Sequence, residues 1–265
     1  AAWCNAKGRT RALFRVVHSD TGILLIGNAD VLGAIQPKLQ MFILRSQVAL
    51  TDLSNEESIL GLAGPAAETL LTETAGTLPT APGEVSRAGD LHIIALPGAT
   101  GLRYLLVAPR AEAAALQSRL MEALTPADSA FWQLLEIQAG IPDVVLETME
   151  QFIPTMMNLE PLGGISYQKG CYPGQEVVAR MHYLGKLKRR LYRLEIAGDS
   201  PAPGAKILDA KGAEAGSVVI AATAADGNAE LLAVLRIDAA DAGGLTLDGL
   251  NLTSLSLPYQ PPEAA

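Results

Sequence analysis

Two apolar runs near the start of the chain have the length and composition of β-strands. Residues 12–17 are Ala-Leu-Phe-Arg-Val-Val, residues 23–26 are Ile-Leu-Leu-Ile, and residues 19–22 between them are Ser-Asp-Thr-Gly. Strand-like runs joined by such a turn are typical of a β-hairpin. We therefore predict that the chain starts almost inside a sheet.

The apolar spacing becomes helical from Ala29 to about Phe42. Asn28 or Asp30 can serve as the N-cap of this helix, and Pro37 is tolerated only near a break or a kink. In chain order we then expect strands around Val48 and over 59–63, a helix over 66–74, a pair of strands over 91–96 and 103–108, and a helix over 111–123. This succession predicts an α+β body in which helices pack on mainly antiparallel sheets.

The next helix has the clearest boundaries in the sequence. Thr125 is the expected N-cap, Pro126 fits the first helical position and Asp128 fits position N3. Gly140 and Pro142 then supply the stop signals.

After Lys186 the pattern changes to short strand-like runs separated by Gly and Asp turns, which predicts a small β-barrel or sandwich. The expected strands are 191–196, 217–222, 231–237 and 252–257. We therefore divide the chain into a body over 1–185 with two subdomains, a barrel over 186–258, and a frayed tail over 259–265.

Composition excludes several classes of protein. With 49% hydrophobic residues the chain can bury a large core, yet its longest apolar runs fall far short of the roughly 18 residues that a membrane span needs. Cys4 and Cys171 cannot form a disulfide framework, and we expect both to be free thiols in a reducing cytoplasm. The net charge of -8 disfavours broad binding of nucleic acids. We interpret the basic run at 186–190 as a solvated strand edge.

The segment from Gly163 to Arg180 reads GGISYQKGCYPGQEVVAR and is the most informative in the chain. Its glycines indicate tight turns, and Pro173 can start a helix, which places Cys171 on a loop leading into a helix N-terminus. That terminus and the nearby Lys169 would favour the thiolate of Cys171. The alternative is a small buried side chain that fills the loop, and the pattern favours neither.

A nucleophilic cysteine also needs a general base. His182 is the histidine nearest to Cys171 in the sequence, eleven positions on, and this spacing gives a Cys–His pair little support. Two cysteines and three scattered histidines do not have the spacing of a zinc or iron–sulfur ligand set, so we predict no metal site.

The string Lys-Gly-Cys-Tyr-Pro-Gly-Gln-Glu at 169–176 resembles the signature of the YgfZ family. The likeness also includes residues 1–8, Trp132 with Ala-Gly-Ile-Pro at 139–142, Phe-Ile-Pro at 152–154, Asn-Leu-Glu-Pro-Leu-Gly-Gly-Ile-Ser at 158–166, and Leu-Pro-Tyr at 257–259. It therefore spans essentially the whole chain.

This resemblance implies the fold of the glycine-cleavage aminomethyltransferases, or T-proteins. In that fold, antiparallel sheets and helices form subdomains arranged in a ring around a bound folate, and a small β-barrel follows. The resemblance thus implies tetrahydrofolate or a folate derivative as cofactor. It implies that Trp132 lines the folate site, where an indole can stack on a pterin. Judged by period alone, the face that Trp132 shares with Leu135 and Ala139 fits core packing equally well.

The remaining site residues follow from the same resemblance. It implies Cys171 with Lys169 as the functional group, and the expected folate contacts besides Trp132 are Gln138, Gly170, Tyr172, Gln175, Glu176 and Arg180. Glu176 and Arg180 stand four apart and could instead pair with each other. Likewise, Tyr172 could simply cover the loop.

The sequence departs from the relatives at three places. Gln138 replaces the Glu that usually precedes Ala-Gly, and an amide accepts at only one oxygen where a carboxylate accepts at two, so we predict weaker pterin binding. After Lys7-Gly8, residues 9–13 lack the acidic pair that true aminomethyltransferases use at the reacting amine. Members of the family also normally carry several dozen more residues at the start, forming part of the folate wall, and we expect this chain to lack them.

The leading hypothesis is a folate-binding accessory protein that supports iron–sulfur enzymes and tRNA thiolation. Its expected partners are folate, iron–sulfur enzymes and assembly proteins, while the acidic balance does not favour direct contact with tRNA. The alternative is an enzyme that transfers a one-carbon unit from an amine to tetrahydrofolate, and the missing acidic pair counts against it. A third hypothesis is a noncatalytic adaptor that docks partners through the barrel.

Overall fold

The computed structural model describes residues 1–19, 22–183 and 187–262. The chain divides into two compact units, one formed by Ala1–Arg45 with Glu136–Ala265 and the other by Ser46–Leu135. Helix α4 (Ser129–Gln138) contains the boundary between them. In the described ranges no helix is both long and apolar enough to cross a membrane.

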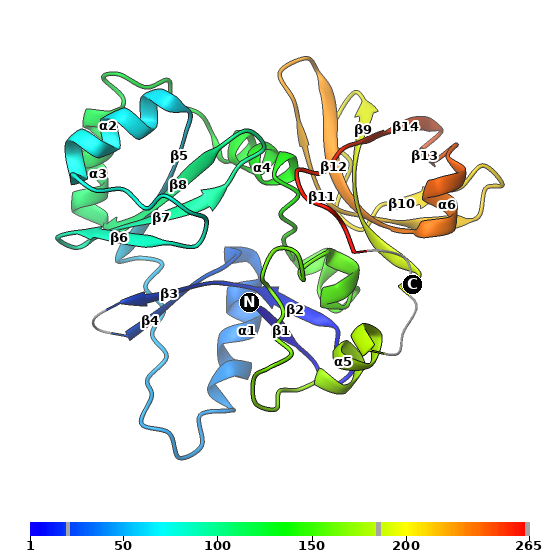
Figure 1. The fold of residues 1–265 in the computed structure, drawn as a ribbon, viewed down its shortest axis with the longest axis horizontal. Helices are drawn as coiled ribbons and strands as arrows, with labels where there is room; N and C mark the ends of the chain where they lie inside the picture. The colour runs from blue at the N-terminus through cyan, green and yellow to red at the C-terminus, as the bar shows by residue number, and fades with distance from the viewer. Residues whose placement is uncertain (20–21, 184–186, 263–265) are drawn as a thin grey trace. The chain divides into compact units, whose positions relative to one another are not determined.

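The unit Ser46–Leu135 is built on a four-stranded antiparallel sheet in the order β5-β8-β7-β6. The strands are β5 (Glu57–Ala63), β6 (Val85–Ala88), β7 (Leu91–Pro97) and β8 (Leu102–Pro109). Alternate residues of the central strands, such as Ile93 and Leu106, form one core with Leu71 of α2 (Pro65–Ala75) and Ala113 of α3 (Arg110–Leu120). Both helices therefore cover the same face of the sheet (Figure 1).

The first part of the other unit consists of two short hairpins and a helix. Strand β1 (Ala2–Cys4) pairs with β2 (Thr10–Leu13), β3 (Arg15–Ser19) pairs with β4 (Gly22–Ile26), and α1 (Ala29–Gln40) follows. Val31 and Ile35 of α1 pack with Ala12 of β2. Two 3-10 turns, η1 (Leu146–Thr148) and η2 (Pro154–Met157), lead toward α5 (Gln175–Tyr183).

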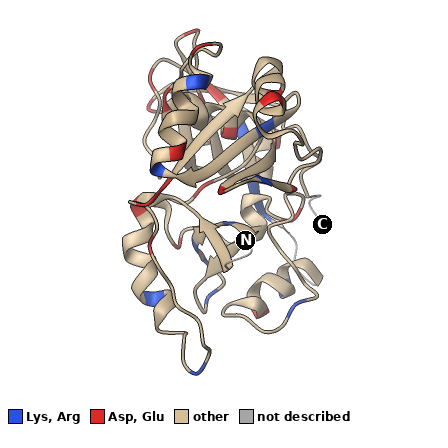
Figure 2. Cartoon of the chain, turned by 90° about the vertical axis from the view of Figure 1, so that its left-hand side faces the viewer, with Lys and Arg blue, Asp and Glu red and all other residues tan. Residues whose placement is uncertain are grey.

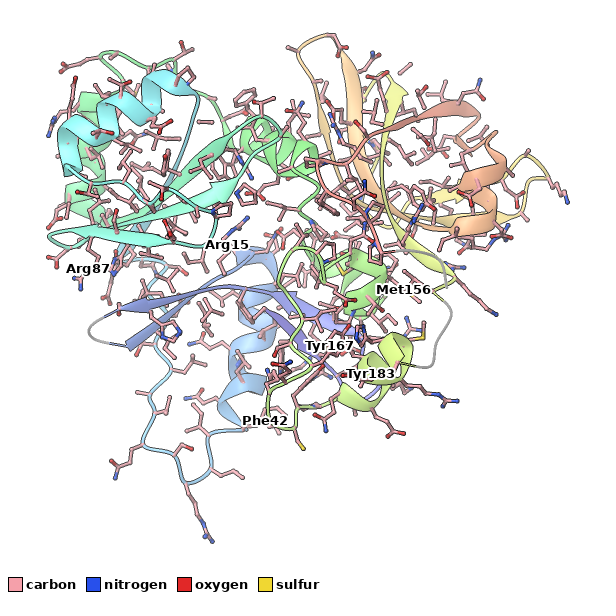
Figure 3. All side chains as sticks on the ribbon, in the orientation of Figure 1. Arg15, Phe42, Arg87, Met156, Tyr167 and Tyr183 are labelled. Carbon is pink, nitrogen blue, oxygen red and sulfur yellow. The ribbon has the colours of Figure 1, made fainter. Side chains whose placement is uncertain are left out.

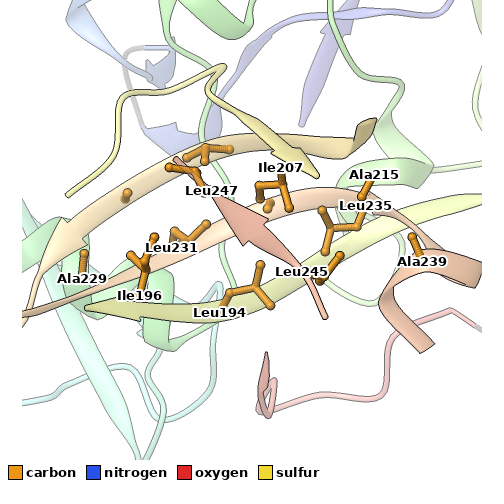
Figure 4. Packing of buried hydrophobic residues seen from close by; sticks show 13 residues of the cluster. Leu194, Ile196, Ile207, Ala215, Ala229, Leu231, Leu235, Ala239, Leu245 and Leu247 are labelled. Carbon is orange, nitrogen blue, oxygen red and sulfur yellow. The ribbon is translucent and has the colours of Figure 1, made fainter. Parts of the chain in front are cut away.

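The second part of that unit is a closed barrel with strand order β10-β11-β12-β9-β14-β13. Its elements are β9 (Arg189–Ala197), β10 (Lys206–Leu208), β11 (Glu214–Thr223), β12 (Asn228–Arg236), α6 (Ile237–Ala242), β13 (Thr246–Leu247) and β14 (Leu250–Leu255). Leu194, Ile207 and Leu231 fill the interior, together with smaller residues such as Ala215 (Figure 4). The period-two pattern of these strands places one row of apolar side chains inside the barrel.

Most of the predicted architecture is confirmed. The structure contains the α+β body with antiparallel sheets, the C-terminal barrel, the first hairpin, α1 with Asn28 as N-cap, and α2 and α3 close to their expected bounds. The hairpin turn at 20–21 lies outside the described residues. The first hairpin strand starts at Arg15 rather than Ala12, because Thr10–Leu13 already pairs with β1. Helix α1 runs through Pro37 and ends one turn later.

Three predictions are wrong. Val48 lies in irregular chain and is 61% exposed, and none of the described strands pairs with it. Helix α4 starts at Ser129, and its cap is Asp128, whose carboxylate accepts from Phe131 N–H at 2.9 Å, instead of Thr125. Tyr259 is not frayed, because its hydroxyl donates to the carbonyl of Gly140 at 2.8 Å. The domain division at 185/186 stays a prediction.

Candidate functional site

Cys171 is exposed and lies on the loop that leads into α5, four positions before Gln175. The side-chain oxygen of Gln175 accepts from the Tyr172 N–H at 3.1 Å, and the Gln175 N–H donates to the Tyr172 carbonyl at 3.2 Å. These two hydrogen bonds close the loop immediately after the cysteine. The position expected for Cys171 is confirmed, and the alternative of a buried loop-filling thiol is excluded.

The N-terminal turn packs against the start of α5. Asn5 Oδ1 accepts from the N–H groups of Lys7 and Arg9 at 2.9 and 3.0 Å and shapes this turn. A Cβ on Gly174 would lie 2.6 Å from the backbone nitrogen of Gly8, and a Cβ on Gly8 would lie 3.0 Å from Cβ of Val177. Both glycines also have positive φ, at +81° and +71°. The structure thus brings together two segments, 1–8 and 169–176, that both carry the family resemblance.

The two thiols have opposite environments. Cys4 is 4% exposed, and burial raises the pKa of its thiol to about 11, against smaller lowering effects of Thr10 and Lys169. Lys169 Nζ lies 4.8 Å from the ring centroid of Tyr172, a cation–π distance. Cys4 therefore stays protonated at neutral pH, and Cys171 is the thiol that meets solvent.

His182 belongs to a separate cluster at the other end of α5. Its Nδ1 lies 3.1 Å from Oε1 of Glu160, and its ring stacks on Tyr167 with centroids 3.9 Å apart. Tyr183 contacts both rings edge-on, and Tyr167 and Tyr183 are labelled side by side in Figure 3. The Tyr167 hydroxyl donates to Glu160, and burial, followed by the Glu160 charge, raises the pKa of this tyrosine.

Cys171 and His182 do not form a Cys–His dyad, which agrees with the sequence analysis, where their spacing of eleven positions gave such a pair little support. Seven helical positions separate Gln175 from His182, which at the α-helical rise is roughly 10 Å. His182 uses Nδ1 for Glu160 instead. Among the described residues, no group of three or more His, Cys, Asp and Glu side chains is placed to hold a metal ion.

Glu176 and Arg180 are both exposed on α5, and Gly170 is exposed on the loop. Within the described parts of the chain, no ion pair joins Glu176 to Arg180 or either one to another residue, so the helical pair expected as an alternative is absent.

In the basic run at 186–190, Arg190 donates to the Tyr192 hydroxyl and the Pro262 carbonyl, and Lys186 lies outside the described residues. Figure 2 shows both basic segments in blue and acidic segments in red on the ribbon.

Trp132 is half-buried on α4 and lies against the sheet face that α2 and α3 leave uncovered. A Cβ on Gly61 would lie 2.5 Å from Cζ3 of the indole, so only glycine leaves room for the ring. Arg103 Cζ lies 4.7 Å from the ring centroid, and its Nε and Nη2 donate to the Pro97 carbonyl at 3.1 and 3.0 Å. Packing against protein is thus one role of this indole, and its contact with folate stays a prediction.

Gln138 lies at the end of α4 and has a partner that the sequence pattern did not reveal. Its Nε2 donates to Oε1 of Glu230 on β12 at 2.9 Å, and Arg193 Nε donates to Oε2 of Glu230 at 2.7 Å. Glu230 is only 7% exposed. The available signal was a single carboxylate inside the apolar run Ala-Glu-Leu-Leu-Ala-Val-Leu at 229–235.

The same end of α4 carries further polar contacts that we did not predict. Arg15 Nη2 contacts both carboxylate oxygens of Glu136 at 2.9 and 2.8 Å. Asn28 Nδ2 donates to Asp143 at 2.8 Å, and burial raises the pKa of this carboxyl. Arg11, in the segment 9–13 that lacks the acidic pair expected from the resemblance, forms an ion pair with Glu150 at 2.6 Å.

Comparisons with known proteins agree with this architecture. A family model described as the CAF17 C-terminal beta-barrel domain matches residues 188–261. The tRNA-modifying protein YgfZ of Yersinia enterocolitica is 35% identical over 97% of this chain and 80% of its own length. The tRNA-modifying protein YgfZ of Colwellia psychrerythraea is 32% identical over 89% of this chain and 73% of its own length.

The fold itself is shared with a solved enzyme structure. The glycine cleavage system aminomethyltransferase T from Bartonella henselae superposes with a TM-score of 0.70 at 16% identity, covering 99% of this chain and 76% of that one. At such identity the likeness shows the fold alone. The identity and coverage of the YgfZ relatives decide the family, and the chain belongs to the YgfZ family.

Proposed function

We propose that this chain is a folate-binding accessory protein that supports iron–sulfur enzymes and tRNA modification, with Cys171 as its functional thiol. The observation that carries this proposal is the exposed Cys171 on a loop fixed by Gly8 and Gly174, within the segment that resembles the family signature. A thiol that only filled space would be buried, as Cys4 is. Two free cysteines fit a reducing cytoplasm as the place of action.

The folate part of the proposal is supported by the aminomethyltransferase fold and by side chains on α4. Trp132 offers an aromatic surface and Gln138 offers an amide, the two kinds of group that recognise a pterin. Gly170, Tyr172, Gln175, Glu176 and Arg180 remain proposed contacts, and Lys169 a proposed partner of the thiol. Tetrahydrofolate or a derivative is the proposed cofactor.

One-carbon transfer, the alternative function, gains little support. It needs carboxylates that can move a proton at the reacting nitrogen. Residues 9–13 provide arginines instead, Glu136 is held by Arg15, and Asp143 accepts from Asn28. These acids are engaged in contacts that stabilise the fold.

Titration with tetrahydrofolate tests the folate part directly. Binding should change the emission of Trp132, so the Trp3→Phe protein should keep the signal and the Trp132→Ala protein should lose affinity by about fivefold or more, since stacking of an aromatic ring contributes roughly 1 kcal/mol or more. Equal affinity of the Trp3→Phe and Trp132→Ala proteins, measured by calorimetry, would refute the placement of folate at Trp132.

A further inference from the structure

Glu230 is an unusual residue for its position. It lies on β12, where its neighbours Ala229 and Leu231 have no exposed surface, and it is itself 7% exposed. A buried carboxylate is costly unless it is paired and hydrogen-bonded. Both oxygens are used here: Oε2 accepts from Arg193 Nε at 2.7 Å, and Oε1 accepts from Gln138 Nε2 at 2.9 Å. Arg193 is further held by the Ser256 carbonyl.

This contact fixes the orientation of the Gln138 amide. A carboxylate can only accept, so the NH₂ group of Gln138 must face Glu230 and the amide oxygen must face away from it. The described part of the chain contributes no hydrogen-bond donor to that oxygen, and Gln138 is half-buried. The amide therefore presents one acceptor in a fixed direction.

We infer that Glu230, held by Arg193, is a positioning residue that orients Gln138 so that its oxygen accepts from the amino-pyrimidinone edge of a pterin. This inference rests on the proposed function, because it names how the folate head group is recognised. It also explains why the chain has an amide at position 138. A Glu there would place two carboxylates against each other at the 2.9 Å contact, and like charges at that distance are strongly unfavourable.

The two positions should therefore act as a unit. Exchanging them, with Gln138→Glu and Glu230→Gln together, keeps one amide and one carboxylate in contact, and the amide oxygen introduced at position 230 could still accept from Arg193. Gln138→Glu alone leaves two carboxylates in contact, and Glu230→Gln alone leaves two amides in contact. In Glu230→Gln the new amide oxygen faces Arg193, so its NH₂ group faces Gln138, which must turn its own oxygen toward position 230, and the acceptor offered to the pterin is lost.

Four proteins test this inference: the unchanged chain, Gln138→Glu, Glu230→Gln and the double exchange. Tetrahydrofolate is titrated into each by calorimetry, after thermal unfolding has shown a cooperative transition. We expect each single change to raise the Kd about tenfold, the worth of one well-placed hydrogen bond, and the double exchange to return it to within about threefold of the unchanged chain. For Gln138→Glu this reverses the expectation from the sequence alone, that a carboxylate would bind the pterin more tightly, because the new carboxylate would face Glu230. Gln117→Glu, which adds the same charge on an exposed position of α3, should leave the Kd unchanged.

A second ligand separates positioning from general stability. A tetrahydrofolate analogue without the 2-amino group should bind more weakly than tetrahydrofolate to the unchanged chain, and Glu230→Gln should bind the two alike. If Glu230→Gln does not fold because Arg193 loses its counter-charge, Gln138→Glu, which keeps Glu230 against Arg193, still decides, since an unchanged Kd in that variant would overturn the inference. Single and double variants with equal Kd values, or undiminished discrimination in Glu230→Gln, would overturn the inference while leaving folate binding intact. No binding of tetrahydrofolate by the unchanged chain would overturn the proposed function and this inference with it.

Discussion

Gly174 and Gly8 meet backbone against backbone, since a Cβ on Gly174 would lie 2.5 Å from Cα of Gly8. They belong to two separate segments of the likeness to YgfZ proteins, 1–8 and 169–176, and their contact sets the position of the loop that carries Cys171. A side chain at either position would push the loop from the N-terminal turn. The thiol thus depends on glycines that are far apart in the sequence.

The substitution Gly174→Ala should lower the free energy of unfolding by about 2 kcal/mol or more, because it adds a backbone collision to the strain of a positive φ. Gly163→Ala is the matched control: its φ is also positive, at +68°, but nothing lies within 4 Å of the added Cβ. That control should cost about 1 kcal/mol. Equal losses in urea unfolding would show that the contact with the N-terminal turn contributes nothing.

The two cysteines should differ sharply in reactivity. Burial raises the pKa of Cys4 to about 11, so at pH 8 roughly one molecule in a thousand carries its thiolate, and access is blocked as well. Iodoacetamide should therefore modify one thiol in the native protein, at Cys171, and two after denaturation. Mass spectrometry of the intact Cys171→Ser protein should show no native modification; rapid labelling of that variant would contradict the assigned burial of Cys4.

Trp132 should move when Gly61 gains a side chain. In a Trp3→Phe background, Gly61→Ala places a methyl group 2.5 Å from Cζ3 of the indole and should shift its emission to longer wavelength, with a loss of about 1–3 kcal/mol in unfolding free energy. Gly101→Ala, where the added Cβ meets nothing within 4 Å, serves as control. Unchanged emission in Gly61→Ala would mean that the ring does not rest on this strand.

Tyr259 should contribute to stability in a pH-dependent way. Burial raises its pKa to about 12, above the ordinary value of about 10, so the folded protein keeps the phenol proton that the unfolded chain releases. Stability should fall as the pH rises from about 10 to 12. Tyr259→Phe should lose about 1 kcal/mol at neutral pH, through the hydrogen bond to Gly140, and should show a shallower decline in this alkaline window.

The sequence predicts elements well where local signals and tertiary packing agree. Asn28 directly precedes the helical apolar pattern of 29–42, and in the structure its side chain caps α1 by accepting from the Asp30 N–H. The alternation of apolar residues likewise predicts the longer strands of the barrel. The start of α4 was misplaced, since Thr125 and Pro126 form a good local start signal but Asp128 supplies the hydrogen bond. Strands β10 and β13, of three and two residues, are too short to leave a periodic pattern.

The same distinction between local signals and tertiary contacts applies to the candidate site. The loop position of Cys171 follows from glycine and proline spacing, which is local. The contacts that define its surroundings, Gly8 against Gly174 and Gln138 with Glu230, join positions about 90 to 170 residues apart, and no periodic pattern encodes them. The ring arrangement of the subdomains stays a prediction.

The most direct test of the central claim measures thiolated nucleosides in tRNA from cells that lack their own YgfZ protein and express this chain. The account predicts that the unchanged chain and Cys4→Ser, at equal protein levels, restore thiolation, and that Cys171→Ser does not. Full restoration by Cys171→Ser would contradict the assignment of this thiol as the functional group.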